Sequence, residues 1–220
     1  RQRQMCIRDR FWRMSSTWVG GMGVVMFALL ILPSLGRSKM TLSNVELSSM
    51  AKDNYRYRTQ MIVQVLLVVY VGLTVLSTLL LKMAGMNWFD ALCHAMSACA
   101  TSGFSTKNAS ISFYNSPAID TILILVMAIA GMHFGLIYAT VTGKRSNLFR
   151  SEVTRFYVGM LLFCSLAIAV SLYAAELYPT FGTSFRHACF QFVTVASTTG
   201  FATADSNTWT SFAIITLLFG

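Results

Sequence analysis

Long runs without a charged residue constrain the fold of this chain more than any other feature. Three runs contain no Asp, Glu, Lys, Arg or His: residues 18–36, 59–81 and 156–175. A fourth, 121–142, contains His133 as its one ionisable residue. A helix needs about 20 apolar residues to cross a bilayer, so the four runs predict four membrane-spanning helices. The apolar run 208–220 predicts a fifth, which the last residue of the sequence interrupts.

The positive charge of the chain is placed to orient these helices. The formal net charge is +9, which in a soluble protein would suggest a nucleic-acid partner, but only 11% of the residues are charged. Nine Lys and Arg residues lie in two segments between spans, 37–58 and 143–155, against three on the other side, Lys82, Lys107 and Arg186. Because Lys and Arg accumulate in cytoplasmic loops, the two basic segments are predicted to be cytoplasmic. The partner implied is a lipid membrane, and no nucleic acid.

The first ten residues break this charge pattern. They read RQRQMCIRDR and would place four arginines on the outer side. We interpret residues 1–10 as a non-native leader that resembles translated adapter sequence, and exclude them from fold reasoning. The alternative is a genuine basic loop.

An internal repeat organises the rest of the sequence. Residues 87–105 and 184–202 align without a gap at a spacing of 97 positions. The identical pairs are Ala91 and Ala188, Thr101 and Thr198, Gly103 and Gly200, Phe104 and Phe201, and Thr106 and Thr203. A fixed period indicates a repeated structural unit.

Each copy predicts a short helix followed by a turn. Asn87 and Ser184 are good N-cap residues, so helices are expected at 88–100 and 185–197, and 13 residues do not span a bilayer. Ser116 followed by Pro117 predicts the start of the next helix.

The turns after the short helices are the candidate site. Non-helical backbone at membrane depth survives only inside protein or along a water-filled path. Carbonyls aimed at such a path replace the hydration shell of a cation, and glycine permits the conformations that turn carbonyls the same way. The segments carry no charge, which favours a weakly hydrated monovalent ion. The candidate ion-binding residues are Thr101, Ser102, Gly103, Phe104, Thr198, Thr199, Gly200 and Phe201.

Three segments resemble the Trk/Ktr/HKT superfamily of potassium transporters, in particular its TrkH type: residues 20–23, 101–117 and 197–203. The resemblance covers 11–220. It implies an all-α membrane protein of repeated M1–pore helix–filter hairpin–M2 units in a pseudo-fourfold, potassium-channel-like arrangement, here truncated at both ends. The implied organisation is the second helix of unit 1 (11–36), a cytoplasmic loop (37–58), complete unit 2 (59–142), a cytoplasmic loop (143–155) and unit 3 truncated in its second helix (156–220). The first and fourth filters are then absent.

The resemblance further implies what the whole protein does. It implies potassium uptake across the bacterial inner (plasma) membrane, a homodimer, and cytoplasmic nucleotide-binding regulatory subunits of the TrkA/KtrA kind. The transported ion is K⁺, with no cofactor and no transition-metal site. A sodium or sodium/potassium transporter of the same superfamily stays open, as does a broken-helix secondary transporter of a small solute. An enzyme is not expected, because the spans contain no paired carboxylates, HExxH motif or Ser/His/Asp set.

Several residues are assigned to packing. Phe104 and Phe201 are expected to pack behind the filter with only their backbone near the ion. Gln191 is expected to bind between helices, and His133 to be a neutral histidine that binds another helix or faces an inner cavity. The glycines at 20, 21 and 23 are expected to permit close helix contact.

Overall fold

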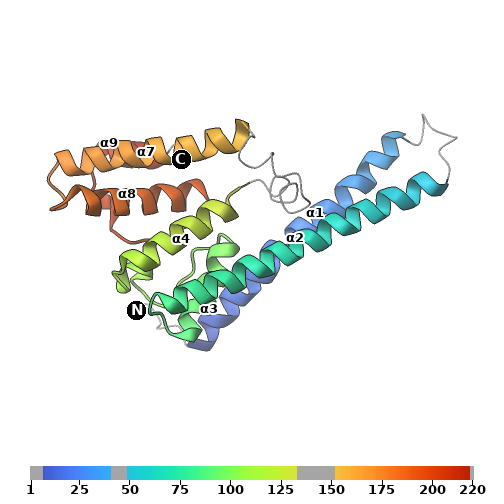
Figure 1. The fold of residues 1–220 in the computed structure, drawn as a ribbon, viewed down its shortest axis with the longest axis horizontal. Helices are drawn as coiled ribbons and strands as arrows, with labels where there is room; N and C mark the ends of the chain where they lie inside the picture. Colours follow the sequence, from blue (N-terminus) through green and yellow to red (C-terminus); the bar gives the residue numbers. More distant parts are fainter. Residues whose placement is uncertain (1–6, 41–48, 133–151, 219–220) are drawn as a thin grey trace.

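The computed structural model describes residues 7–40, 49–132 and 152–218, and in these ranges every regular element is a helix. In Figure 1, two long helices, α1 (Ile7–Met40) and α2 (Ser49–Met83), run side by side in opposite directions. Both continue beyond their apolar runs into the basic segment at 37–58. His133 and residues 143–151 lie outside the described ranges, as do the side chains of Arg37, Lys39, Lys52, Arg56 and Arg58.

Two short helices lie in equivalent surroundings. The first, α3 (Trp88–Cys99), packs against α1, α2 and the following helix α4 (Pro117–Ala130). The second, α8 (Phe181–Ala196), packs against α4, α7 (Glu152–Ala174) and α9 (Ser211–Leu218). Each short helix is therefore enclosed by the helix before it, the helix after it, and one helix from the preceding part of the chain. The 3-10 helices η1 (Ser110–Phe113) and η2 (Ser206–Thr208) follow the two turns.

The starts of the short helices test the predicted caps. Asn87 is the N-cap of α3, and its side chain accepts from the Trp88 N–H at 2.9 Å, as predicted. The prediction that Ser184 caps the second short helix is wrong. Thr180 is the cap there and accepts from the Thr183 N–H, so α8 begins one turn earlier and Ser184 is buried within it. Both residues are good cap formers, and the chain uses the first.

The predicted start of α4 is confirmed, but the hydrogen bonding at its N-cap differs from that of α3. Ser116 is the N-cap and Pro117 occupies the first helical position, but the Ser116 side chain makes no capping hydrogen bond. The proline defines this start, because its missing N–H is one of the unpaired donors of a first turn.

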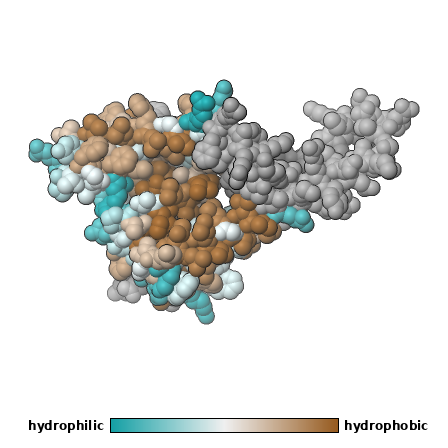
Figure 2. All heavy atoms as spheres, in the orientation of Figure 1, coloured by the Kyte–Doolittle hydropathy of each residue, from teal (hydrophilic) through white to brown (hydrophobic). Residues whose placement is uncertain are grey.

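Two described helices are long and apolar enough to cross a membrane, at Leu66–Met83 within α2 and at Glu152–Ala174. α4 is a shorter apolar helix in the described range. Large apolar side chains of α7 point outward, with Phe156 75% and Phe163 73% exposed. Figure 2 shows apolar residues over most of the described part of this face. An apolar surface of this extent is unfavourable in water and favourable in contact with lipid.

The N-terminal turn of α1 includes residues from the segment interpreted as a leader. Residues 7–10 are helical, and the Arg10 guanidinium donates to the Thr106 carbonyl and, at 2.7 Å, to Asn108 Oδ1. The non-native origin of residues 1–10 stays a prediction.

Candidate functional site

The two turns have the same unusual backbone. We call residues 101–106 the first hairpin and residues 198–203 the second hairpin. In the first, Thr101 has φ 49° and Gly103 has φ 67°. In the second, Thr198 has φ 57° and Gly200 has φ 88°. Positive φ is uncommon for a threonine, so its occurrence at two positions 97 residues apart reflects a shared local fold.

Backbone hydrogen bonds repeat with the same spacing. The Ser102 N–H donates to the Ser97 carbonyl at 2.9 Å, and the Thr199 N–H donates to the Thr194 carbonyl at 2.8 Å. These bonds close the last turn of each short helix onto its hairpin, because the left-handed residue before them reverses the chain. The C-terminal ends of α3 and α8 therefore lead directly into the hairpins.

The two hairpins meet at Gly103. A Cβ built on this glycine would collide with the carbonyl oxygen of Thr199 and lie 2.9 Å from the carbonyl carbon of Gly200. A Cβ on Gly200 would meet nothing within 4 Å. Only glycine allows the backbone approach at position 103, whereas position 200 is open.

A second contact joins the loops beyond the glycines. The Ala202 N–H donates to Ser110 Oγ at 3.2 Å, and the Ser112 N–H donates to the Ala202 carbonyl at 3.2 Å. The segment around η1 thus holds both backbone groups of a residue in the second hairpin.

The hydroxyls beside the glycines bind their own helices. Ser102 Oγ lies 3.1 Å from Ser97 Oγ, and Thr199 Oγ1 lies 2.8 Å from Ser197 Oγ. In both hairpins these bonds tie the side chain back to the end of the short helix. The hydroxyls of Ser102 and Thr199 are thus occupied by hydrogen bonds near the helix ends.

The two phenylalanines differ. Phe201 is 1% exposed, and its N–H donates to Thr194 Oγ1 at 2.9 Å. Phe104 is only partly buried and lies under the guanidinium of Arg13, 5.2 Å from its ring centroid. Phe201 therefore packs behind its hairpin as expected, whereas Phe104 does so only in part.

The short helices also bind the return side of each hairpin, through residues that sequence reasoning missed or misplaced. His94 of α3 contacts Ser105, and His187 of α8 contacts Thr203. Gln191 donates to the Ala204 carbonyl at 2.9 Å, so its expected role as a bond between helices is wrong. Burial lowers the pKa of both histidines, and at His187 the Arg186 charge adds to the effect, so burial favours the neutral ring. The sequence signal that could have indicated these roles is the 97-residue repeat, in which His94 and Gln191 occupy equivalent positions.

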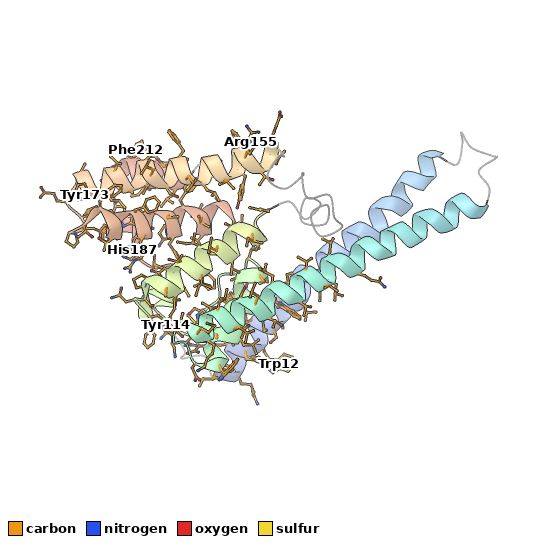
Figure 3. All side chains as sticks on the ribbon, viewed as in Figure 1. Trp12, Tyr114, Arg155, Tyr173, His187 and Phe212 are labelled. Carbon is orange, nitrogen blue, oxygen red and sulfur yellow. The ribbon has the colours of Figure 1, made fainter. Side chains whose placement is uncertain are left out.

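An ion pair joins the helices α8 and α4. Arg186 Nε on α8 lies 3.4 Å from Asp120 Oδ2 on α4, and the two side chains are 19% and 3% exposed. Figure 3 labels neighbouring His187 on the side of α8 that faces α4. A second pair, Lys107 Nζ to Asp90 Oδ2 at 3.2 Å, joins α3 to the residue just after the first hairpin and is more exposed.

Two glycine contacts repeat between helices. Gly21 of α1 lies against Ala100 and the hydroxyl of Tyr70, which donates to the Trp18 carbonyl at 3.1 Å. Gly131, after α4, lies against Ser197 and the hydroxyl of Tyr157, which lies 3.4 Å from the Ala128 carbonyl it donates to. In each case the tyrosine binds the carbonyl three residues before the glycine. Gly21 permits the expected close contact, but a Cβ on Gly20 or Gly23 would meet nothing within 4 Å.

Within the ranges that the structure describes, no three His, Cys, Asp or Glu side chains gather as metal ligands would. The polar groups of the hairpins are carbonyls and hydroxyls. Such oxygens suit a hard monovalent or divalent cation rather than a transition metal.

Comparison with known proteins identifies relatives over nearly the whole chain. A family model described as TrkH, cation transport protein, matches residues 3–220. The Trk system potassium uptake protein TrkH of Halomonas elongata is 37% identical over 90% of this chain and 42% of its own length. The protein of the same name from Salmonella typhimurium is 35% identical over 94% of this chain and 44% of its own.

A solved structure agrees with this assignment. The crystal structure of the potassium transporter TrkH from Vibrio parahaemolyticus matches with a TM-score of 0.82 and 27% identity. The match covers 98% of this chain and 44% of the other. The chain thus spans less than half the length of the relatives it matches.

Proposed function

The chain belongs to the TrkH family of cation transport proteins, which are transporters and not enzymes, and on this premise we propose that it takes part in potassium uptake. In this proposal both hairpins are selectivity filter segments of a channel-like pore in a bacterial plasma membrane. Two units of the pore, each a helix, a pore helix (α3 or α8), a hairpin and a second helix, lie in this sequence.

The observation that carries the proposal is the matched backbone of the hairpins and their contact at Gly103. Left-handed residues at 101, 103, 198 and 200 turn successive carbonyls in ways that an ordinary strand or helix does not. The meeting of the hairpins supports a shared path, because backbone oxygens from several segments are needed to replace the water around an ion. Thr101 and Thr198 add hydroxyl oxygens.

The charge distribution supports a cation. Both short helices end at a hairpin, and the C-terminal end of a helix carries partial negative charge. The hairpins contain no Asp or Glu, so the attraction is that of neutral oxygens and dipoles. A neutral site of this kind favours a weakly hydrated ion such as K⁺ over a divalent one.

The same reasoning gives the wider assembly. The equivalent surroundings of α3 and α8, and the repeated contacts of Gly21 and Gly131, support units arranged around a pseudo-fourfold axis. We place the basic segments at 37–58 and 143–155 in the cytoplasm, where nucleotide-binding regulatory subunits of the TrkA/KtrA kind would bind, and we place the protein in a homodimer. Charge reversal of Arg56 and Arg58 that left regulatory-subunit binding unchanged would contradict the docking site.

The test uses the full-length protein in a bacterial strain that lacks its own potassium uptake. Gly103→Ser and Gly200→Ser should each abolish growth on low potassium at unchanged membrane expression. Gly85→Ser is the matched control, because Gly85 also has a positive φ, 101°, but lies in the turn between α2 and α3. Growth of Gly103→Ser at the wild-type rate would defeat the filter assignment.

The alternatives give different uptake patterns. Sodium entry equal to rubidium entry would favour the sodium or sodium/potassium transporter. Uptake of an organic solute without potassium would favour a secondary transporter with broken helices.

A further inference from the structure

His94 lies in the centre of a small polar chain behind the first hairpin. Its side chain is 0% exposed. Ring atom Nδ1 is 2.7 Å from the Asp90 carbonyl oxygen, and Nε2 is 2.9 Å from Ser105 Oγ. A carbonyl only accepts, so Nδ1 carries the proton of the neutral ring and Nε2 accepts from the Ser105 hydroxyl.

This tautomer orders the hairpin beyond its glycine. Because Ser105 donates its hydroxyl proton to His94, its oxygen is free to accept from the Lys107 N–H, which lies 3.1 Å away. One imidazole therefore connects the α3 backbone, the Ser105 side chain and the backbone after it.

The same ring contacts the second hairpin. The centroid of His94 is 6.0 Å from that of Phe201, with the rings tilted by 39°, and Tyr114 meets it edge-on at 5.7 Å. Phe201 directly follows Gly200 and is buried. A residue of α3 thus touches one hairpin by a hydrogen bond and the other by ring packing.

The second short helix uses a different residue at the same position. Gln191 stands 97 residues after His94, and its amide donates to the Ala204 carbonyl at 2.9 Å. One turn earlier, Asp90 and His187 occupy equivalent positions in the two short helices. Asp90 pairs with Lys107, just after the first hairpin, and His187 contacts Thr203 at the end of the second. The described bond of Gln191 is local, whereas His94 reaches both hairpins.

We propose that His94 is a positioning residue that fixes the return side of the first hairpin and the Phe201 side of the second, so that ion selectivity depends on it. Gln191 positions the second hairpin alone. This inference rests on the proposed function, since it assumes that the hairpins select the ion. It predicts an effect on the ratio of ions transported, beyond any effect on the amount of folded protein.

The experiment measures initial uptake of rubidium and sodium by the purified full-length protein in liposomes. His94→Leu fills a similar volume without a hydrogen bond and should lower the rubidium-to-sodium ratio about tenfold, the effect of one lost buried hydrogen bond on an equilibrium. His94→Gln introduces the residue that stands at position 191. Its rubidium-to-sodium ratio should stay within about threefold of wild type, because the amide oxygen can accept from Ser105. Gln191→Leu should lower the ratio less than His94→Leu.

A purely structural role would reduce uptake of both ions together and leave their ratio unchanged. A wild-type ratio in His94→Leu would therefore overturn the proposal, as would a His94→Gln protein as unselective as His94→Leu. Should His94→Leu fail to fold, Ser105→Ala removes the same hydrogen bond from the hairpin side. A wild-type ratio in Ser105→Ala would also overturn it.

The failure of this proposal differs from that of the proposed function. If the wild-type protein carries no potassium or rubidium, or if Gly103→Ser transports normally, the filter assignment has failed. If wild type transports selectively and Gly103→Ser does not, while His94→Leu keeps its selectivity, only the role of His94 has failed.

Discussion

The two hairpins share a backbone but not an environment. Thr101 and Gly103 repeat the left-handed conformations of Thr198 and Gly200, yet Gly103 lies against the opposite backbone and Gly200 is open. Phe104 is partly exposed and Phe201 is buried. Local sequence therefore determines the turn, whereas the neighbours determine how much each residue of the turn tolerates change.

The largest difference is expected between Gly103→Ala and Gly200→Ala. Both variants place an alanine at positive φ, at a cost of about 1–2 kcal/mol. In Gly103→Ala the new Cβ also collides with backbone atoms of the second hairpin, which no rotamer change relieves. We expect Gly103→Ala to lose all uptake and to melt at a lower temperature than Gly200→Ala in detergent. Equal melting temperatures would show that the hairpins do not meet as described.

The two ion pairs should differ next. Asp120→Asn leaves Arg186 without its partner in a mostly buried site, and removing one member of a buried pair costs about 3–5 kcal/mol. Lys107→Met breaks the more exposed pair and should therefore cost less. Thermal unfolding of the two variants measures the difference. If Lys107→Met is as unstable as Asp120→Asn, the buried pair between α4 and α8 contributes no more than the exposed one, which would contradict this expectation.

The two glycine contacts give a smaller effect with a built-in rescue. A Cβ on Gly131 would lie 2.7 Å from the Tyr157 hydroxyl, whereas one on Gly21 would lie 3.4 Å from the Tyr70 hydroxyl. Gly131→Ala should therefore cost about 1–3 kcal/mol by overpacking, and Gly21→Ala less. Adding Tyr157→Phe to Gly131→Ala should restore part of the stability. Melting curves of the single and double variants test this, and the absence of any rescue would locate the strain elsewhere.

The last comparison concerns the hydroxyls beneath the hairpins. Thr194→Val removes the acceptor of the buried Phe201 N–H and should cost about 1–3 kcal/mol. Ser97→Ala, at the equivalent position of α3, removes only a bond between hydroxyls and should cost less. Hydrogen exchange at the Phe201 amide should accelerate in Thr194→Val. Unchanged exchange would show that the threonine does not hold this amide.

Much of the fold followed from local signals in the sequence. The 97-residue repeat located both short helices, and Asn87 and Pro117 marked helix starts that the structure confirms. Ser184 misled, because Thr180 offers the same cap chemistry one turn earlier.

The contacts between distant segments could not be read from local patterns. Asp120 lies in the first turn of α4, where the helix dipole favours a carboxylate, but it also pairs with Arg186 of another helix. His94 carried no motif, and its importance lies in which hairpin atoms surround it. Phe104 and Phe201 are the same residue in the same register, so only the neighbouring chain explains their different burial.

The ion-binding role of the hairpins is tested most directly by locating the ion. Crystals of the full-length protein grown with rubidium or thallium give anomalous scattering at the sites these ions occupy. We expect peaks within coordinating distance of backbone oxygens of the first and second hairpins, beside Gly103 and Gly200. Peaks confined to other parts of the protein, with none beside these hairpins, would contradict it.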